Sequence, residues 1–326
     1  MSVALAVAGA AAAVWGAGRV YGYIEGVRVW SDLADELRLR RLRIEDLDRA
    51  WVNNPRRSHA IVSLTTIPSR IRLIGETLKS LMRQTRAPAR IVINVPHTSR
   101  RENSAYEIPA MLGNLASVEI HRCDDWGPAT KLIPSVLRYP PSQPIIVVDD
   151  DRIYPPNLVA DLEDASARHP DHALGLSGWR VPDDLTDRPT TLWRDLRMKP
   201  PVPAKATRIK AALEVDVLQG MSGYLVRPEF FDSSRLTDYS AAPAAAFFVD
   251  DVWISGHCLA AKLVIPAARS NYEPKCHARH YKSTSVALVN RGDGTPESRN
   301  NTIMIRHLEE AWLCTRYGTV PADAPE

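Results

Sequence analysis

The chain has 326 residues, 45% of them hydrophobic and 24% charged, which excludes an intrinsically disordered protein and is enough for one large or two smaller domains. Its net charge of +3 is mild and no nucleic-acid-binding signature is present, so we expect no DNA or RNA partner. The four cysteines are far apart and form no CxxC pair, which favours reduced, packed thiols over disulfides or a zinc site.

The first 27 residues form an apolar segment without the leading basic residue of a cleaved signal peptide. Residues 2–18 are rich in alanine and glycine and reach about the lower length limit of a membrane span. Arginines follow this stretch, so an anchor here would leave the rest of the chain on the cytoplasmic side of the membrane. The alternative is a soluble cytoplasmic protein whose N-terminal helix packs on the body.

Residues 28–57 are predicted to form a charged amphipathic helix and a linker. Apolar residues recur at helical spacing from Val29 to Trp51. The run of arginines between Arg38 and Arg43 could rest on anionic lipid headgroups or form a solvated face. A break follows at Asn53-Asn54-Pro55, so we expect the main domain at residues 58–312 and a tail at residues 313–326.

The main domain alternates apolar strands with helices. Strands are expected at residues 60–66, 91–95, 118–120, 213–218, 224–226 and 263–265. Ser69 is expected to cap a helix between the first two strands, and Asn157 a helix that runs to Arg168. The alternation predicts an α/β fold with a mostly parallel central sheet and helices on both faces.

A further apolar strand at residues 144–148 ends in Asp149, Asp150 and Asp151. Ligands bind at the carboxyl ends of strands in open α/β sheets. Three carboxylates at one point repel each other, and a divalent cation with oxygen ligands would offset that repulsion. The sequence therefore predicts a metal site here, with an acidic turn as the alternative.

Three more segments contain candidate site residues. Lys131 follows a glycine–proline turn and is predicted in the first turn of a helix, where it suits a phosphate; otherwise it is a solvated lysine. The loop at residues 219–223 brings backbone close to a ligand or forms a structural bulge. Asp250 and Asp251 begin a helix, where a carboxylate can act as a general base or as an ordinary N-cap.

Taken together, the motifs resemble those of nucleotide-sugar-dependent glycosyltransferases of the GT-A type, in particular the family 2 and exostosin-like domains. They are Ser63-Leu64-Thr65-Thr66-Ile67-Pro68-Ser69-Arg70, Asp125-x-Gly-Pro-x-x-Lys131, Asp149-Asp150-Asp151 and Asp250-Asp251. Their order, and the spacing of about a hundred residues between the two acidic sites, make the combination specific. The resemblance implies a single Rossmann-like GT-A domain with a nucleotide-binding half, residues 58–168, and an acceptor half, residues 169–312.

The resemblance also implies roles for the residues of the nucleotide-binding half. Thr65, Thr66 and Arg70 would line the base and ribose pocket. Asp125 and Lys131 would contact the nucleotide and its diphosphate.

In the same way, Asp149 and Asp151 would hold a Mn²⁺ or Mg²⁺ ion that bridges the diphosphate, and Asp150 would reach the ribose. His280 would be a third metal ligand, or else a surface histidine. Gly223 lies in the loop that would support the sugar and the acceptor.

The implied reaction moves a sugar from a nucleoside-diphosphate sugar to a hydroxyl of a glycan, polysaccharide or lipid-linked acceptor, with Asp251 or Asp250 as the base. Trp126, Trp179 and Trp193 could stack on a sugar or pack in the protein. A sugar nucleotidyltransferase is the alternative enzyme, although the loop after the first strand lacks its glycine- and arginine-rich composition. An inactive nucleotide- or sugar-binding protein is the other alternative.

Overall fold

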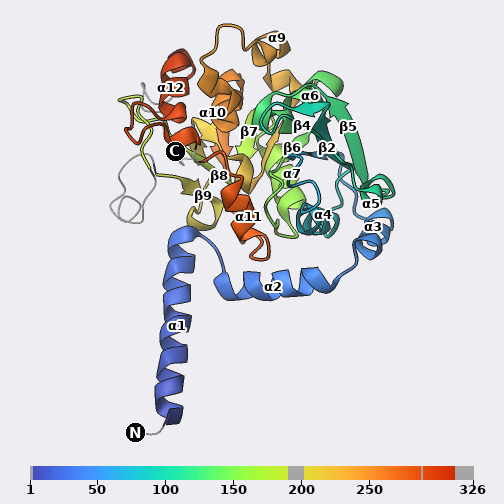
Figure 1. Ribbon diagram of the computed structural model, residues 1–326, viewed down its shortest axis with the longest axis vertical. Coiled ribbons are helices and arrows are strands. Elements are labelled where there is room, and N and C mark those ends of the chain that lie inside the picture. Colours follow the sequence, from blue (N-terminus) through green and yellow to red (C-terminus); the bar gives the residue numbers. More distant parts are fainter. Residues whose placement is uncertain (1–2, 190–201, 288, 313–326) are drawn as a thin grey trace.

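The computed structural model of the protein describes residues 3–189, 202–287 and 289–312 (Figure 1). Its main sheet has eight strands: β1 (Ile61–Thr65), β2 (Arg90–Pro96), β5 (Val118–Cys123), β6 (Ile145–Val147), β7 (His172–Gly175), β10 (Leu213–Val215), β12 (Tyr224–Val226) and β13 (Ala261–Val264). The spatial order is β10-β13-β7-β12-β6-β1-β2-β5. β12 is antiparallel to β6 and β7, β10 is antiparallel to β13, and the other pairs are parallel. The predicted mostly parallel α/β sheet is confirmed.

Helices cover both faces of this sheet. The helices of the described residues, including α1 and α2 outside these two layers, are α1 (Val3–Glu25), α2 (Val29–Arg41), α3 (Ile44–Val52), α4 (Gly75–Met82), α5 (Ala110–Gly113), α6 (Ile133–Arg138), α7 (Leu158–Arg168), α9 (Ser233–Thr237), α10 (Asp250–His257), α11 (Ala278–Ser283) and α12 (Asn300–His307). Side chains of β6 alternate between two cores, with Ile146 on the side of α4 and α7, and Ile145 and Val147 on the side of α6, α10 and α12. This alternation follows from the two-residue period of a strand.

The predicted strand at residues 213–218 is divided between two sheets. Its first part, β10, pairs with β13 in the main sheet. Its second part, β11 (Val217–Leu218), belongs to a three-stranded sheet with β8 (Ser177–Trp179) and β9 (Ala204–Lys205). Between them the buried Asp216 accepts a hydrogen bond from the Val181 N–H at 2.7 Å, which accounts for a polar residue at this crossing. A short hairpin of β3 (Thr98–Ser99) and β4 (Ser104–Ala105) completes the strands of the described residues.

Two predicted helix starts were wrong in detail. Ser69 does not cap α4, which begins at Gly75, because the N–H and hydroxyl of Ser69 both donate to Glu102. Lys131 ends the 3-10 helix η1 (Gly127–Lys131) instead of lying in the first turn of α6. Asn157 does occupy the N-cap position of α7, but its side chain accepts from the Thr85 hydroxyl and makes no capping bond.

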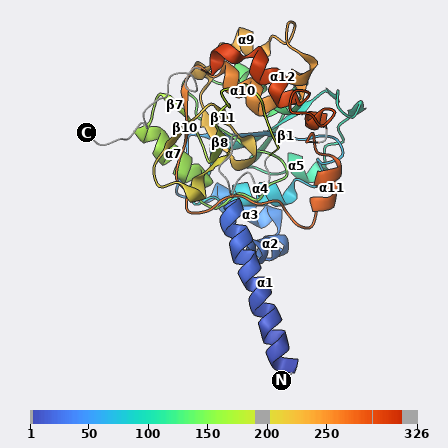
Figure 2. The ribbon, with the colours of Figure 1, turned by 90° about the vertical axis from the view of Figure 1, so that its left-hand side faces the viewer.

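The N-terminal helix α1 projects away from the body, and α2 runs along the end of the body from which α1 departs (Figures 1 and 2). Val7, Val14 and Val20 of α1 remain 59–62% exposed, so the helix does not pack on the body along its length as the alternative predicted. Within the described ranges, no helix combines the length and the apolar character needed to cross a membrane. The predicted tail at residues 313–326 lies outside the described residues.

Candidate active site

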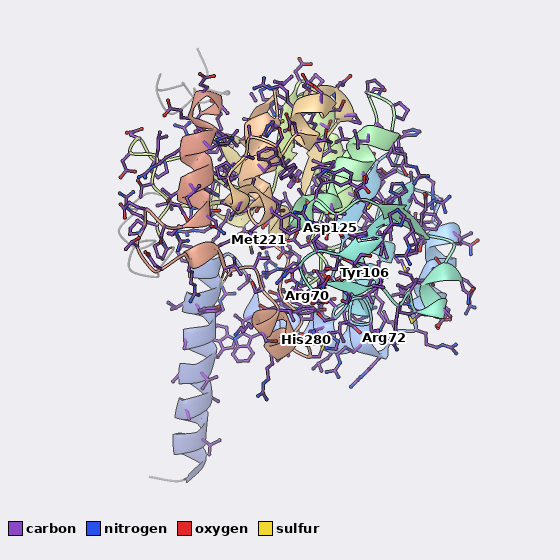
Figure 3. The ribbon with its side chains drawn as sticks, turned by 45° about the horizontal axis from the view of Figure 1, so that its top comes forward. Arg70, Arg72, Tyr106, Asp125, Met221 and His280 are labelled. Atoms are coloured by element: carbon purple, nitrogen blue, oxygen red, sulfur yellow. The ribbon has the colours of Figure 1, made fainter. Side chains whose placement is uncertain are left out.

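A cavity of about 380 Å³ opens at the carboxyl ends of β1 and β6. Its wall includes ten of the residues that the sequence motifs brought forward: Thr65, Thr66, Arg70, Asp125, Lys131, Asp149, Asp150, Asp151, Asp250 and Asp251. In Figure 3, Arg70, Tyr106, Asp125 and Met221 mark this region from separate segments of the chain. The fold therefore brings together motifs that are more than a hundred residues apart in the sequence.

Lys131 connects the two acidic sites. Its Nζ lies 2.8 Å from Asp149 Oδ1, 2.6 Å from Asp250 Oδ2 and 3.4 Å from Asp251 Oδ1. Burial alone would lower the pKa of this lysine, but the three carboxylates hold the pKa well above its ordinary value. Lys131 is thus a fixed, buried cation at the meeting point of the motifs, a position that sequence spacing did not reveal.

Asp251 is not a helix cap. The N-cap of α10 is Val249, and no side chain forms a capping bond there. Asp251 instead accepts a hydrogen bond at 3.0 Å from the N–H of Gly220, in the loop before β12. Burial raises the pKa of Asp251 to about 7, Lys131 partly offsets this rise, and Asp250 adds to it. A carboxyl group that titrates near neutral pH is suited to accept a proton at working pH.

Gly220 leaves the space that the Lys131 ammonium occupies. A Cβ added at Gly220 would lie 2.1 Å from Lys131 Nζ and 3.2 Å from Asp149 Oδ1. The loop at residues 219–223 therefore brings its backbone close to Lys131 at Gly220, and the predicted approach to a ligand stays a prediction.

We expect Gly220→Ala to displace the Lys131 ammonium and to lower the free energy of unfolding by about 1–3 kcal/mol, as overpacking of a filled site does. Urea unfolding followed by circular dichroism measures the change. Gly75→Ala is the matched control, because a Cβ there meets nothing within 4 Å. It should leave stability unchanged or raise it by up to about 1 kcal/mol. Equal stability of Gly220→Ala and the wild type would contradict the close packing.

Asp150 lines the cavity but is held by side chains of the protein itself, and the ribose contact that the sequence resemblance implied for it stays a prediction. Its carboxylate accepts from the Thr66 hydroxyl at 2.6 Å and from Arg70 Nη1 at 3.1 Å, and its side chain is only 9% exposed. Burial raises the pKa of Asp150 to about 6, against the opposing effect of the Arg70 guanidinium. The ion pair with Arg70, buried on both sides, means that Asp150 holds this guanidinium in position.

Arg70 in turn joins the end of β6 to the segment at the end of α11. Its Nε donates to the Thr284 hydroxyl at 2.8 Å, and its Nη2 donates to the Tyr281 carbonyl at 2.9 Å. Arg101, which no motif pointed to, also donates to the carbonyl of Thr284. The residues that follow, Ser285 to Ala287, line the cavity, so these two arginines support one of its walls.

Thr65 and Asp125 line the cavity with polar groups that are already paired. The Thr65 hydroxyl donates to the Asn94 carbonyl at 2.8 Å. The Asp125 carboxylate accepts from the N–H groups of Gly127 and Arg100 at 2.7 and 2.6 Å. In this conformation they shape the wall, and the nucleotide contacts predicted for them stay a prediction.

Two of the candidate residues lie away from the cavity wall. His280 Nε2 lies 3.2 Å from the Ser69 carbonyl oxygen and is not among the residues that line the cavity with Asp149 and Asp151. Gly223 adopts a positive φ of 88°, and an added Cβ would lie 2.9 Å from Leu158 Cδ1. Its glycine is explained by backbone conformation and packing.

The charges of the cavity lining, and the exposure of Asp149 and Asp151, bear on whether the site can bind a metal ion. Among the described lining residues, six carboxylates face four cations, namely Arg70, Arg101, Lys131 and Arg152. Asp149 and Asp151 keep 30% and 20% of their side chains exposed, and Asp151 contacts Arg70 and Arg152 only at 3.4 and 3.3 Å. In the described part of the chain no three or more His, Cys, Asp or Glu residues form a metal cluster. Two partly free carboxylates and an excess of negative charge fit an ion that takes its other ligands from a substrate.

Other lining residues carried no sequence signal. Tyr106 donates its hydroxyl to the Thr66 carbonyl at 2.9 Å and comes from a loop without a motif. Met221 belongs to the loop at residues 219–223, which was noted only for its glycines. Among the tryptophans, Trp179 lines the cavity, Trp126 does not, and Trp193 lies outside the described residues.

No protein-family model and no curated protein matches the sequence. Solved structures that resemble the chain include TarS from S. aureus, at 12% identity over 79% of this chain and 71% of that one, with a TM-score of 0.43. They also include the mannosyltransferase PcManGT from Pyrobaculum calidifontis in complex with GDP-Man and Mn²⁺, at 14% identity over 93% and 86% of the two chains (TM-score 0.42). A third is the 2-C-methyl-D-erythritol 4-phosphate cytidylyltransferase of Francisella tularensis, at 12% identity over 69% and 97% (TM-score 0.37). These similarities concern the fold alone.

Proposed function

We propose that the protein is a glycosyltransferase that moves a sugar from a nucleoside-diphosphate sugar to a hydroxyl of a glycan, polysaccharide or lipid-linked acceptor. One observation carries the proposal: the carboxylates that follow β6 and the near-neutral Asp251 meet in one cavity, on either side of Lys131. A transferase of this kind needs positive charge beside the leaving diphosphate and a base beside the acceptor, and the cavity has candidates for both.

On the acceptor side, Asp251 takes the proton of the acceptor hydroxyl while the oxygen attacks the anomeric carbon of the sugar. The Gly220 N–H bond to this carboxylate holds it in place. On the donor side, the sugar–phosphate bond breaks and the nucleoside diphosphate leaves with the bonding electrons. Lys131 stabilises the negative charge that grows there, because a preorganised cation in a water-poor site costs no reorganisation when the bond breaks.

Asp149 and Asp151 would hold a Mn²⁺ or Mg²⁺ ion. Mg²⁺ is commonly bound by one or two carboxylates, with the other ligands from substrate phosphates and water, so a third protein ligand such as His280 is not required. When bound, the ion supplies positive charge beside the diphosphate. The excess of carboxylates over cations in the cavity supports this assignment.

We expect Asp151→Asn to weaken metal-dependent binding of a nucleoside diphosphate at least about tenfold, because it removes one of two charged ligands. It should leave the fold intact, since the contacts of Asp151 with arginines are long and its repulsion from its neighbours is relieved. Calorimetric titration with UDP or GDP, with and without Mn²⁺, measures the affinity. Asp183→Asn, an exposed aspartate outside the cavity, is the control. Unchanged affinity in Asp151→Asn would rule out the metal assignment.

The reaction itself is tested with a panel of nucleotide sugars, by metal-dependent release of nucleoside diphosphate. The nucleotidyltransferase alternative predicts instead that a sugar phosphate and a nucleoside triphosphate yield pyrophosphate. The loop after β1 argues against that alternative, because its only arginines are the buried Arg70, which is paired with Asp150, and Arg72, which pairs with Glu107 on the surface. Release of neither product would favour the inactive binding protein.

For the location of the reaction, we propose the cytoplasmic side of a membrane. The arginines that follow α1 are exposed. The cytoplasmic leaflet carries anionic lipids that attract such residues.

A further inference from the structure

Helix α2 buries Leu39 against the body but turns three other large apolar side chains toward solvent. The side chains of Trp30, Leu33 and Leu37 are 40%, 42% and 48% exposed. Their spacing of three and four residues places them on one side of the helix. In a helix that merely packs on a globular body this side would be buried, so the orientation needs another explanation.

The acidic residues of α2 take the inward position. Asp35 forms a two-bond ion pair with Arg83 at 2.8 and 2.9 Å. Glu36 is buried and accepts from two backbone N–H groups just before α11, at 3.0 and 3.1 Å. Asp32 is buried and lies 3.6 Å from Arg269. These contacts fix the rotation of the helix, because turning it over would bury the apolar side only by breaking all of them.

The arginines of α2 face outward with the apolar residues. Arg38, Arg40 and Arg41 are exposed, and none forms an ion pair within the described part of the chain. The outward side of α2 therefore contains apolar and cationic groups and no carboxylate. We call Trp30, Leu33, Leu37, Arg38, Arg40 and Arg41 the basic–apolar face.

Neighbouring elements extend this character. Glu36 of α2 binds the segment just before α11, and this segment and α11 contain three exposed cations, Lys275, Arg279 and Lys282. α1 leaves the body at the same end with exposed valines and Trp15. The Trp30 ring lies against α1, since a Cβ at Gly18 would come within 3.0 Å of it, so the two helices are packed at their junction.

We propose that the basic–apolar face binds the surface of a bilayer that contains anionic lipid. Aromatic and leucine side chains bury themselves at the boundary between headgroups and acyl chains, while arginines pair with anionic headgroups. A second copy of the chain is a poorer occupant, because two such faces would bring their arginines together without an exposed carboxylate from α2 to neutralise them. The proposal concerns only where the protein binds and is independent of the transfer reaction.

The face is coupled to the cavity through α11. Arg70 bonds to Tyr281 and Thr284 at the end of that helix, and the residues after it line the cavity. A bilayer held against α2 and α11 thus lies next to one wall of the site.

The test is sedimentation of the full chain with vesicles of phosphatidylcholine alone and of phosphatidylcholine with phosphatidylserine, without any donor. We expect binding only to the anionic vesicles, weakened by salt. Arg38→Gln/Arg40→Gln/Arg41→Gln should weaken binding about a hundredfold. Leu33→Ser/Leu37→Ser should weaken it at least about tenfold, since these side chains lose burial in the interface.

Matched controls are Leu259→Ser, which is 71% exposed on the body, and Arg90→Gln/Arg122→Gln/Arg138→Gln, exposed arginines of β2, β5 and α6. Both controls should bind anionic vesicles like the wild type. The proposal would be overturned if either α2 variant bound anionic vesicles as tightly as the wild type, or if the wild type bound neutral vesicles equally well. It would also be overturned if the wild type bound no vesicles and instead self-associated in sedimentation velocity, with Leu33→Ser/Leu37→Ser abolishing that self-association. Because nucleoside diphosphate release is measured separately, a failure here leaves the proposed reaction untouched.

Discussion

Asp251→Asn is expected to lower the rate of sugar transfer by about 10² to 10⁴, the range for loss of a general base, while donor binding remains normal. Asparagine has the same shape and can still accept the Gly220 N–H bond through its amide oxygen. It cannot take a proton from the acceptor. Since Asp251 forms no capping bond in α10, the helix start should not depend on its charge.

The pH dependence of the same variant gives a second measurement. Burial raises the pKa of Asp251 to about 7, so the wild-type kcat/KM should rise with pH up to about 7 and then level off, as the base loses its proton. Asp251→Asn should lack this acid limb. The group also affects stability: its pKa is higher when folded than when unfolded, so its contribution to the free energy of unfolding falls as pH rises toward 7.

Asp250→Asn is the neighbouring comparison. Asp250 is less exposed than Asp251, 13% against 30%, and is the closest carboxylate to Lys131. We expect its amide variant to lose less activity than Asp251→Asn and to keep the acid limb. If both variants transfer sugar at the wild-type rate, this acidic pair does not supply the base.

Lys131→Met is expected to lower the free energy of unfolding by about 3–5 kcal/mol at neutral pH, the range for leaving buried charges without a partner. Methionine matches the length and apolar stem of lysine but leaves Asp149, Asp250 and Asp251 without their shared cation. The variant should also lose donor turnover, because nothing replaces the positive charge beside the diphosphate.

The free energy of unfolding that Lys131→Met loses should be larger at high pH than at low pH. Burial already raises the pKa of Asp251 above its unfolded value, and loss of the Lys131 charge removes the effect that opposes this rise. Stability is then regained as pH falls below neutrality and is lost as pH rises. Urea unfolding at pH 5 and pH 8 measures this difference.

Lys262→Met is a matched control, since Lys262 is also buried but, among the residues that the structure describes, its Nζ bonds only to the carbonyls of Cys258 and Ala260. Lys262→Met should lower the free energy of unfolding by nearly the same amount at pH 5 and pH 8. A loss below about 1 kcal/mol in Lys131→Met, or a loss without pH dependence, would contradict the central place given to this lysine.

Local patterns in the sequence were sufficient for the strands of the main sheet other than β7, which was not predicted, and for the positions of the acidic motifs. The apolar residues of β1 and β6 are buried, and Asp149 to Asp151 do follow the end of β6 at the mouth of a cavity. Asp250 and Asp251 do begin a helix. These predictions succeeded because strand and helix periods are set by the geometry of the chain itself, and ligands collect where parallel strands end.

The hydrogen-bond and ion-pair partners of the charged residues could not be predicted from local sequence patterns. Lys131 reaches Asp251 across 120 positions, and Asp251 bonds to Gly220 rather than to its own helix. Asp150 was assigned to a ribose but is held by Arg70 and Thr66. In α2 the helical spacing of Trp30, Leu33 and Leu37 showed that these residues share one side of the helix, but it did not show that this side faces solvent. The sequence by itself determined most helices and strands of the main domain and the types of residue at their ends. Only the tertiary structure decided which charged side chains contact each other and which helix faces remain exposed to solvent, because both depend on how distant segments pack.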